Sequence, residues 1–339
     1  MVKLKNSFVF LLLVFSLLIS IFISTSVGSV SIPIKNILKI IVDNLPLINS
    51  LVTSQYEKSH EIIVMNLRLP RVILGVLVGI SLSISGAVMQ GLFKNPMASP
   101  FVLGISSGAS MGAALSIVLL PFIPIKILSF ITSLLTVFLV YKLAKTGKKT
   151  SLATLLLIGL AVGAFFSGLT SFLMYISGRN LQKIVFWIMG SLGTSSWNDV
   201  SQIALVILIG FPMVYYFSRD LNILQLGEEQ AKHLGVEVER TKKIVLVLTA
   251  LLTSIAVSVS GIIGFIGLIV PHMIRMILGP DHKILIPSSA LLGGIILIWS
   301  DTIARTIIAP SELPVGIITE LLGAPFFIYL AKKKGSDMW

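Results

Sequence analysis

The chain contains no cysteine and few charged residues. With no cysteine among 339 residues, disulfides, thiolate metal sites and cysteine nucleophiles are excluded. Charged residues make up 12% of the sequence, apolar residues make up 55%, and the mean hydropathy is +1.00. Soluble domains contain about 25% charged residues. This composition indicates a polytopic membrane protein rather than the two soluble domains that the length would otherwise favour.

Motifs for catalysis, metal binding and nucleic-acid binding are also missing. Residues 147–150 (GKKT) superficially resemble the end of a phosphate loop, but Lys142 stands where the first glycine is required, and no strand precedes it. The net charge of +12 could suggest nucleic acid, but the basic residues lie at the ends of apolar runs. We therefore expect no catalytic residue, cofactor, metal or nucleic acid, and the four histidines form no clustered site (His60, His233, His272 and His282).

Long uncharged runs predict about ten transmembrane helices in a single transmembrane domain, residues 1–339. The first run could be a signal peptide, but it is long enough to span the membrane, and we expect a retained helix. One short interfacial helix is expected within residues 35–61. The glycines of residues 261–267, with Pro271, should divide residues 244–274 into a long helix and a shorter one. The expected spans are residues 6–34, 72–93, one within 95–125, 125–143, 151–177, 200–217, two within 244–274, 284–303, and a last one ending at 332–334.

The distribution of basic residues predicts the topology. Ten crossings put both termini on one side, and 17 of the 26 basic residues then lie on that side. The positive-inside rule therefore predicts a multi-pass protein of the cell membrane with both termini in the cytoplasm. The tetrapeptides at residues 83–86 (SISG) and 258–261 (SVSG) lie toward opposite ends of their spans. Their placement favours an inverted repeat of helices 2–5 and 7–10.

Residues 219–243 form a charged segment between apolar runs and hold 10 of the 40 charged side chains. Asp220 stands where an N-cap would stand, and Gly227 could end a first short helix in the left-handed C′ conformation. Glu228 and Glu229 suit the start of a second short helix, which Gly235 could end. The segment is either a solvated loop or, as we prefer, a docking element for a cytoplasmic partner. Its expected apolar set is Leu221, Leu224, Leu226, Ala231 and Leu234.

Several motifs along the chain resemble one known family. The chain is similar to the permeases of type II ABC importers, which take up iron-siderophores, haem and cobalamin. That family has ten helices per subunit, two permease subunits, two separate ATPase subunits and an external substrate-binding protein. The motifs are residues 68–71 (RLPR), 85–91 (SGAVMQG), 95–100 (NPMASP), 103–109 (LGISSGA), 226–228 (LGE), 264–272 (GFIGLIVPH), 312–316 (ELPVG) and 322–325 (LGAP).

The resemblance implies roles for three groups of residues. The segment 219–243 matches the coupling helices that dock on the ATPase, through Leu221, Leu224, Leu226, Gly227, Glu228, Ala231, Leu234 and Gly235. Arg68, Arg71 and Arg305 match the external arginines that pair with acidic residues of the binding protein, since the planar guanidinium binds carboxylates bidentately. The cytoplasmic gate falls at Ser151, Leu152 and Ala153, and the translocation path would be lined by Gly159, Gly163, Phe166 and Thr170.

The resemblance implies the transmembrane subunit of an ATP-driven importer for an iron chelate or cobalamin, working as a homodimer in lipid, with no enzymatic activity of its own. An alternative function, and an alternative role for one pair of glycines, stay open beside it. A secondary active transporter with inverted repeats would work without an ATPase, but it would need a titratable residue in the membrane, for which Asp301 is the acidic candidate. The close glycine spacing of Gly159 and Gly163 equally suits tight helix packing.

Overall fold

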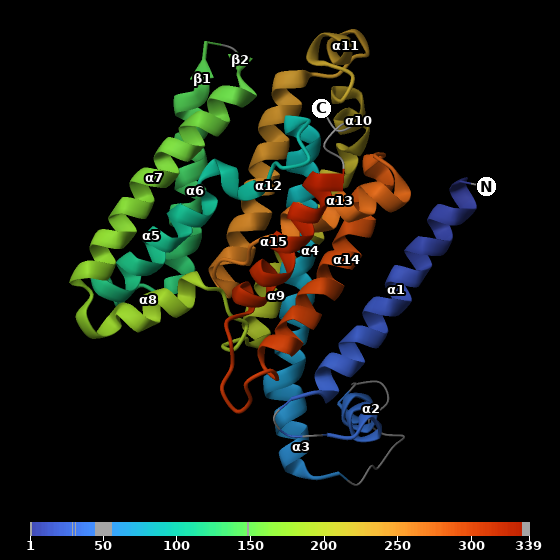
Figure 1. Cartoon of the computed structure of the whole chain (residues 1–339), viewed down its shortest axis with the longest axis vertical. Coiled ribbons are helices and arrows are strands. Elements are labelled where there is room, and N and C mark those ends of the chain that lie inside the picture. Colours follow the sequence, from blue (N-terminus) through green and yellow to red (C-terminus); the bar gives the residue numbers. More distant parts are fainter. Residues whose placement is uncertain (1, 29, 31, 45–55, 148, 334–339) are drawn as a thin grey trace.

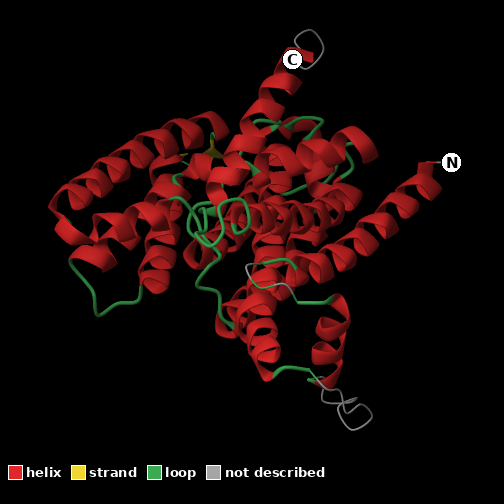
Figure 2. Cartoon of the chain, turned by 60° about the horizontal axis from the view of Figure 1, so that its bottom comes forward, coloured by secondary structure: helices red, strands yellow, loops and turns green. Residues whose placement is uncertain are grey.

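The computed structural model describes residues 2–28, 30, 32–44, 56–147 and 149–333. Within these ranges the regular structure is almost entirely helical (Figure 2). The strands in this part of the chain are β1 (Lys145–Thr146) and β2 (Lys149–Thr150), which pair as a two-residue antiparallel hairpin. The prediction of an all-α membrane protein is confirmed.

Seven helices are long and apolar enough to cross a membrane, and three shorter apolar helices accompany them. Their order along the chain reproduces the ten predicted segments. The long ones are α1 (Val2–Ser26), α4 (Leu69–Phe93), α6 (Ile125–Ala144), α7 (Leu152–Ile176), α9 (Trp197–Tyr216), α12 (Val238–Ser260) and α14 (His282–Ala304). The shorter ones are α5 (Ile105–Val118), α13 (Ile266–Leu278) and α15 (Val315–Lys333).

Helix α4 lies at the centre of the bundle and packs against α9, α12, α13 and α14 (Figure 1). Small residues allow this packing, since they let helix backbones approach closely. A Cβ atom on Gly86 would lie 1.7 Å from the carbonyl oxygen of Gly267 on α13. A Cβ atom on Gly79 would lie 2.3 Å from that of Gly293 on α14. The glycines of α4 therefore set the spacing of the core.

Helix α1 packs along α14 at one edge of the bundle, while α7 lies at the opposite edge (Figure 1). Ser24 and Thr302 share a hydroxyl hydrogen bond of 2.7 Å, and Trp299 Nε1 donates to Ser20 Oγ at 3.0 Å. Polar contacts of this kind join helices inside an apolar bundle. Helix α1 is therefore part of the packed bundle.

The helices of the two halves of the bundle, α4 to α7 and α12 to α15, follow a similar pattern of lengths. Helices α4 to α7 contain 25, 14, 20 and 25 residues, and α12 to α15 contain 23, 13, 23 and 19. The short second member of each series matches the expected repeat. Gly261, with φ +69°, ends α12, so the predicted division of residues 244–274 is correct. Pro271 takes no part in it, because it lies inside α13.

The ends of the bundle carry different elements. At one end lie the hairpin, α10 (Ser218–Leu224), α11 (Glu228–His233) and the end of α15, and at the other lie α2 (Ile34–Asp43) and α3 (Lys58–Ile62) (Figure 1). The segment 35–61 thus holds the single short helix predicted, α2, and also the start of a longer helix at α3, while residues 45–55 lie outside the described part. A π-helix η1 (Ile63–Arg68) joins α3 to α4 as one continuous helix. The remaining elements are η2 (Pro100–Leu103), η3 (Gly178–Asn180) and α8 (Leu181–Ile188).

Candidate functional site

The charged segment forms two short helices, as predicted, but the first begins earlier than expected. Helix α10 starts at Ser218, directly after Phe217, which follows the last residue of α9. Asp220 therefore lies inside the first turn and is not an N-cap. Its carboxylate accepts a hydrogen bond of 3.3 Å from Thr241 Oγ1 on α12. The N-cap prediction was wrong because α9 runs into α10 without the extended residue that an N-cap requires.

Both glycines have positive φ, but only one adopts the predicted left-handed C′ conformation. Gly235 has φ +82°, and the N–H groups of Gly235 and Val236 donate to the carbonyls of Lys232 and Ala231 at 3.0 and 2.9 Å. These two bonds form a Schellman motif at the end of α11. Gly227 has φ +124° and ψ 153°, which is a region that only glycine populates. The left-handed prediction is wrong for Gly227, although the position still requires glycine.

The predicted apolar set of this segment divides into two groups. Leu221, Leu224 and Ala231 are at most 3% exposed and pack into the core of the bundle. Leu226 is 63% exposed and Leu234 is 55% exposed. The buried three hold the segment on the bundle, so they are not available to a partner. Of this apolar set, Leu226 and Leu234 are the members whose side chains remain exposed.

Arg68 does not lie on the outer surface as predicted. The residue is 6% exposed, and its guanidinium donates to the carbonyl oxygens of Thr25 at 3.1 Å, Ser26 at 2.9 Å and Val30. These carbonyls lie at and just beyond the end of α1, where backbone acceptors lack partners within the helix. Arg68 thus fastens the end of α1 to η1.

Arg71 and Arg305 are engaged inside the chain as well. Arg71 makes a bidentate pair with Asp301 through Nε and Nη2, at 3.0 and 2.9 Å, and its Nη1 lies 2.8 Å from Glu312. Arg305, which is 5% exposed, lies 3.8 Å from Asp301 and also donates to the carbonyl and hydroxyl of Ser24. The guanidinium groups of all three arginines are therefore engaged within the chain, and their external docking role stays a prediction. They use their hydrogen bonds to join α1, α4 and α14.

Two glycines predicted to line a path instead pack against neighbouring elements. A Cβ atom on Gly159 would lie 2.3 Å from the carbonyl oxygen of Val102 on η2. A Cβ atom on Gly163 would lie 3.4 Å from Ser107 Oγ on α5. The close-packing interpretation of this glycine pair is therefore the correct one.

Phe166 and Thr170, the other two residues predicted to line the path, lie on the same face of α7 as Gly159 and Gly163. Thr170 is 5% exposed and donates to the carbonyl of Phe166, which is half-buried. Successive residues turn by about 100° in an α-helix, so the open face of α7 is on the opposite side. The four residues predicted to line the path therefore lie on the side of α7 that packs against the chain. The exposed face carries Leu157, Leu160, Ala161, Ala164, Gly168, Phe172 and Tyr175.

The predicted gate lies where the hairpin meets α7. Ser151 is the N-cap of α7, and its Oγ accepts a hydrogen bond of 3.4 Å from the backbone N–H of Thr154. Ser151 and Ala153 are exposed, whereas Leu152 packs against the core. The bulky side chain of Leu152 thus points into the protein, and the two small residues face outward.

A buried lysine near this gate was not recognised in the sequence. Lys242 is 2% exposed and lies 2.5 Å from Glu228 and 3.2 Å from Glu239. The spacing of Glu239 and Lys242 at i and i+3 signals their pairing. Nothing in the sequence signals its third contact, the carbonyl of Thr150, 92 positions away.

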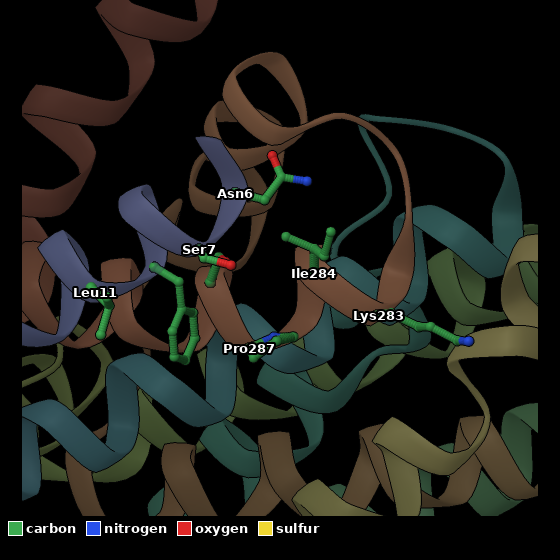
Figure 3. Close-up of a pocket in the computed structure, with 8 residues that line it drawn as sticks. Asn6, Ser7, Leu11, Lys283, Ile284 and Pro287 are labelled. Carbon is green, nitrogen blue, oxygen red and sulfur yellow. The ribbon is translucent and has the colours of Figure 1, made fainter. Parts of the chain in front are cut away.

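A cavity of 510 Å³ lies apart from these residues, between α1 and the start of α14 (Figure 3). Its lining includes Phe10, Leu11, Ile284 and Pro287. It is a mainly apolar crevice at the edge of the bundle that carries α1. Such a crevice suits lipid chains, and it has no contact with the exposed face of α7.

Comparison with known proteins decides the family. The model of the FecCD transport family matches residues 16–333. The chain belongs to the FecCD transport family. The resemblance identified in the sequence motifs is thus confirmed, and this FecCD-family chain is a multi-pass membrane protein.

Among curated relatives of this FecCD-family chain, the cobalamin import system permease protein BtuC of Halobacterium salinarum is 46% identical over 206 residues. The hemin transport system permease protein HmuU of Yersinia pestis is 45% identical over 203 residues. The matches cover 61% and 60% of the chain and only 55% and 60% of the relatives' own lengths.

A solved structure is similar over almost the whole chain. It is described as an inward-facing conformation of a proposed metal-chelate type ABC transporter. It is 33% identical, has a TM-score of 0.82, and covers 96% of this chain and 99% of its own. The type II importer permease fold expected from the motifs is therefore confirmed.

Proposed function

We propose that the chain is the transmembrane subunit of an ATP-driven importer that moves a metal chelate, namely an iron-siderophore, haem or cobalamin. In this proposal residues 1–339 form one transmembrane domain, and two copies of the chain act with two ATPase subunits and an extracytoplasmic binding protein. Both termini and the segment 219–243 lie in the cytoplasm. The relatives that import cobalamin and hemin support the substrate class.

The observation that carries this proposal is the exposed part of α10 and α11. The helices lie at the same end of the bundle as the hairpin (Figure 1), which is also the end rich in basic residues. Leu226 and Leu234 remain exposed there although the rest of the apolar set is buried. Two exposed leucines flanked by charged residues suit a groove on a cytoplasmic partner, since interface cores are apolar and their rims polar.

The exposed faces of α7 and α15 support a second copy and a path between the copies. Leu160 on α7 is 71% exposed, and Leu321 on α15 is 65% exposed. Contiguous apolar surface of this kind is covered either by lipid or by another subunit. With small residues interspersed at Ala161, Ala164 and Gly168, the α7 face offers no charge that would retain a large chelate.

Secondary active transport fits the geometry less well. A proton-coupled carrier needs a titratable residue that can gain and lose its proton in the membrane. Asp301, the candidate for this role, is 2% exposed and paired with Arg71 and Arg305. Loss of this negative charge would leave the buried Arg305 without its ion-pair partner and Arg71 with Glu312 alone.

The proposal is tested with the purified chain in liposomes, with and without an ATPase subunit and a binding protein encoded beside it. We expect uptake of ferric siderophore, hemin or cobalamin only from the complete assembly, together with ATP hydrolysis that the loaded binding protein stimulates. Uptake by the chain alone would refute the proposal in favour of secondary transport.

The outer docking surface is proposed to consist of exposed lysines rather than the three arginines. Lys35 and Lys39 lie one turn apart on α2, and Lys58 begins α3. Reversal of the first two charges in a Lys35→Glu/Lys39→Glu variant should weaken binding-protein affinity about tenfold, because exposed charge pairs contribute up to about 1 kcal/mol each. Affinity is measured by surface plasmon resonance on nanodiscs. The Lys35→Arg/Lys39→Arg variant should bind normally, and equal affinity of both variants would contradict the assignment.

Absence of cysteine allows the α7 face to be tested by single thiols. A Leu160→Cys variant should react with a water-soluble maleimide in the assembled transporter, because the proposed path contains water. A Phe15→Cys variant on α1, at the opposite edge of the bundle and 67% exposed, should stay unlabelled in lipid. Protection of both thiols would indicate that lipid covers the α7 face.

A further inference from the structure

Lys242 is the most deeply buried ammonium group in the described charged segment, and its contacts come from three elements. It lies in the second turn of α12 and is 2% exposed. Its Nζ lies 2.5 Å from Glu228 on α11 and 3.2 Å from Glu239 on α12, and it donates to the carbonyl of Thr150 in β2 at 3.4 Å. A buried charge is tolerated only when it is paired and hydrogen-bonded. The position of Lys242 therefore depends on all three contacts.

Thr150 is held by this cluster through both of its backbone polar groups. Its N–H donates to Glu239 Oε2 at 3.1 Å, and its carbonyl accepts from Lys242. The residue is buried and comes directly before Ser151, the N-cap of α7. The start of α7, where the gate is proposed, is thus fixed to the same cluster that holds α11.

The neighbouring helix α10 is anchored elsewhere. Gln225 donates to the carbonyl of Gly91 on α4 at 2.6 Å, and Asn222 donates to Asp281 at the start of α14 at 2.7 Å. Helix α10 is therefore tied to the centre of the bundle, whereas the ionic contact of α11 leads to the hairpin and α7. The two short helices therefore differ in the parts of the bundle that their polar contacts join.

The cluster contains two carboxylates and one ammonium, and this allows two arrangements. The side chain of Glu228 is 44% exposed, so water can solvate its carboxylate when it leaves Lys242. Lys242 then keeps Glu239 as its counterion and Thr150 as an acceptor. Loss of the Glu228 contact leaves no unpaired buried charge, so it avoids the large cost of breaking a buried pair. Such a reversible contact is suited to a switch.

We infer that Lys242 is a positioning residue that links movement of α11 to the start of α7. When the ATPase displaces α11, Glu228 pulls on or releases Lys242, and the Thr150 backbone shifts with it. This inference rests on the proposed ATP-driven function. It assigns the transmission of the movement to one ion cluster rather than to the rigid segment 219–243 as a whole.

The test compares two adjacent glutamates in the complete transporter with its ATPase and binding protein. Glu228→Gln removes the charge that contacts Lys242. Glu229→Gln makes the same change on the same helix, at an exposed side chain that makes no ion pair within the described structure. We expect uptake per ATP hydrolysed to fall at least about fivefold in Glu228→Gln and to stay within about twofold in Glu229→Gln, as expected for a coupling energy of about 1 kcal/mol.

Labelling of a thiol at the gate gives a measurement that would not change if Lys242 had a purely structural role. In an Ala153→Cys background, binding of a non-hydrolysable ATP analogue should change the rate of maleimide labelling, and Glu228→Gln should abolish this change while the ATPase still binds the nucleotide. A Lys242→Gln variant should lose coupling to the same extent with or without Glu228→Gln. If Lys242→Gln fails to fold, the glutamate pair still decides.

The outcomes separate the inference from the proposed function. If the complete transporter with the unsubstituted chain shows no ATP-dependent uptake, the proposed function fails. If uptake is normal there and both glutamate variants match it, the role of Lys242 is refuted. An equal loss of coupling in both variants also refutes it, because it would reflect a general contact of α11 with the ATPase.

Discussion

A Gly86→Ala substitution is expected to destabilise the protein by about 3 kcal/mol or more, at the upper end of the range for overpacked cores. The new Cβ atom would lie 1.7 Å from the carbonyl oxygen of Gly267, and the next atoms in its way belong to the same backbone. A backbone carbonyl cannot rotate away as a side chain can, so α13 must separate from α4. Since α4 also packs on α9, α12 and α14, the displacement would spread through the core.

The measurement is the apparent midpoint of thermal unfolding in detergent, at a fixed scan rate because membrane proteins often unfold irreversibly. The matched control is Gly168→Ala on α7, where a Cβ atom would meet nothing within 4 Å. We expect a clear drop in the midpoint for Gly86→Ala and no drop for the control. Equal midpoints would contradict the close contact of α4 with α13.

An Asp301→Asn substitution is expected to cost about 3–5 kcal/mol, the usual loss when one member of a buried ion pair is removed. The asparagine keeps the shape of the side chain but leaves Arg71 and Arg305 near each other without their common anion. Glu312 still pairs with Arg71, but it is 46% exposed and cannot serve Arg305. The loss should therefore fall mainly on the contact between α14 and α1, which Arg305 makes through Ser24.

The same unfolding assay tests this expectation, and Glu237→Gln is its control. Glu237 pairs with Arg240 on the surface, where both side chains are at least 70% exposed and the pair contributes little. If Asp301→Asn unfolds at the midpoint of this control, the ion cluster has no structural role. In that case the assignment of Arg71 and Arg305 to the interior would also be in doubt.

The helices were predictable because each uncharged run must satisfy its own backbone hydrogen bonds in the membrane. The end of α11 was predictable for a similar local reason, since Gly235 adopts the conformation that its neighbours require. These features depend on residues close together in the sequence. The family could also be identified, because its motifs consist of short continuous segments.

Features that depend on distant partners could not be predicted. Arg71 pairs with Asp301, which is 230 positions away in the sequence. The sequence alone therefore could not distinguish this pairing from a free arginine that docks a partner. The exposed face of α7 could not be predicted because the helix is apolar on all sides and has no polar stripe to orient it. Glycines at i and i+4 fit a packed face and a smooth path alike, and only the contact of Gly159 with Val102 distinguishes them.

The continuous helix from Lys58 to Phe93 exceeds the thickness of a membrane. Its 36 residues extend about 54 Å at about 1.5 Å per residue, whereas the hydrocarbon layer is about 30 Å thick. If the helix stands upright, about 24 Å projects beyond that layer, and α2 packs against this projection through Ile37, Ile40 and Val64. In the proposed importer, a binding protein that docks at this end of the bundle must fit around this ridge, so the ridge restricts the orientations in which it can dock.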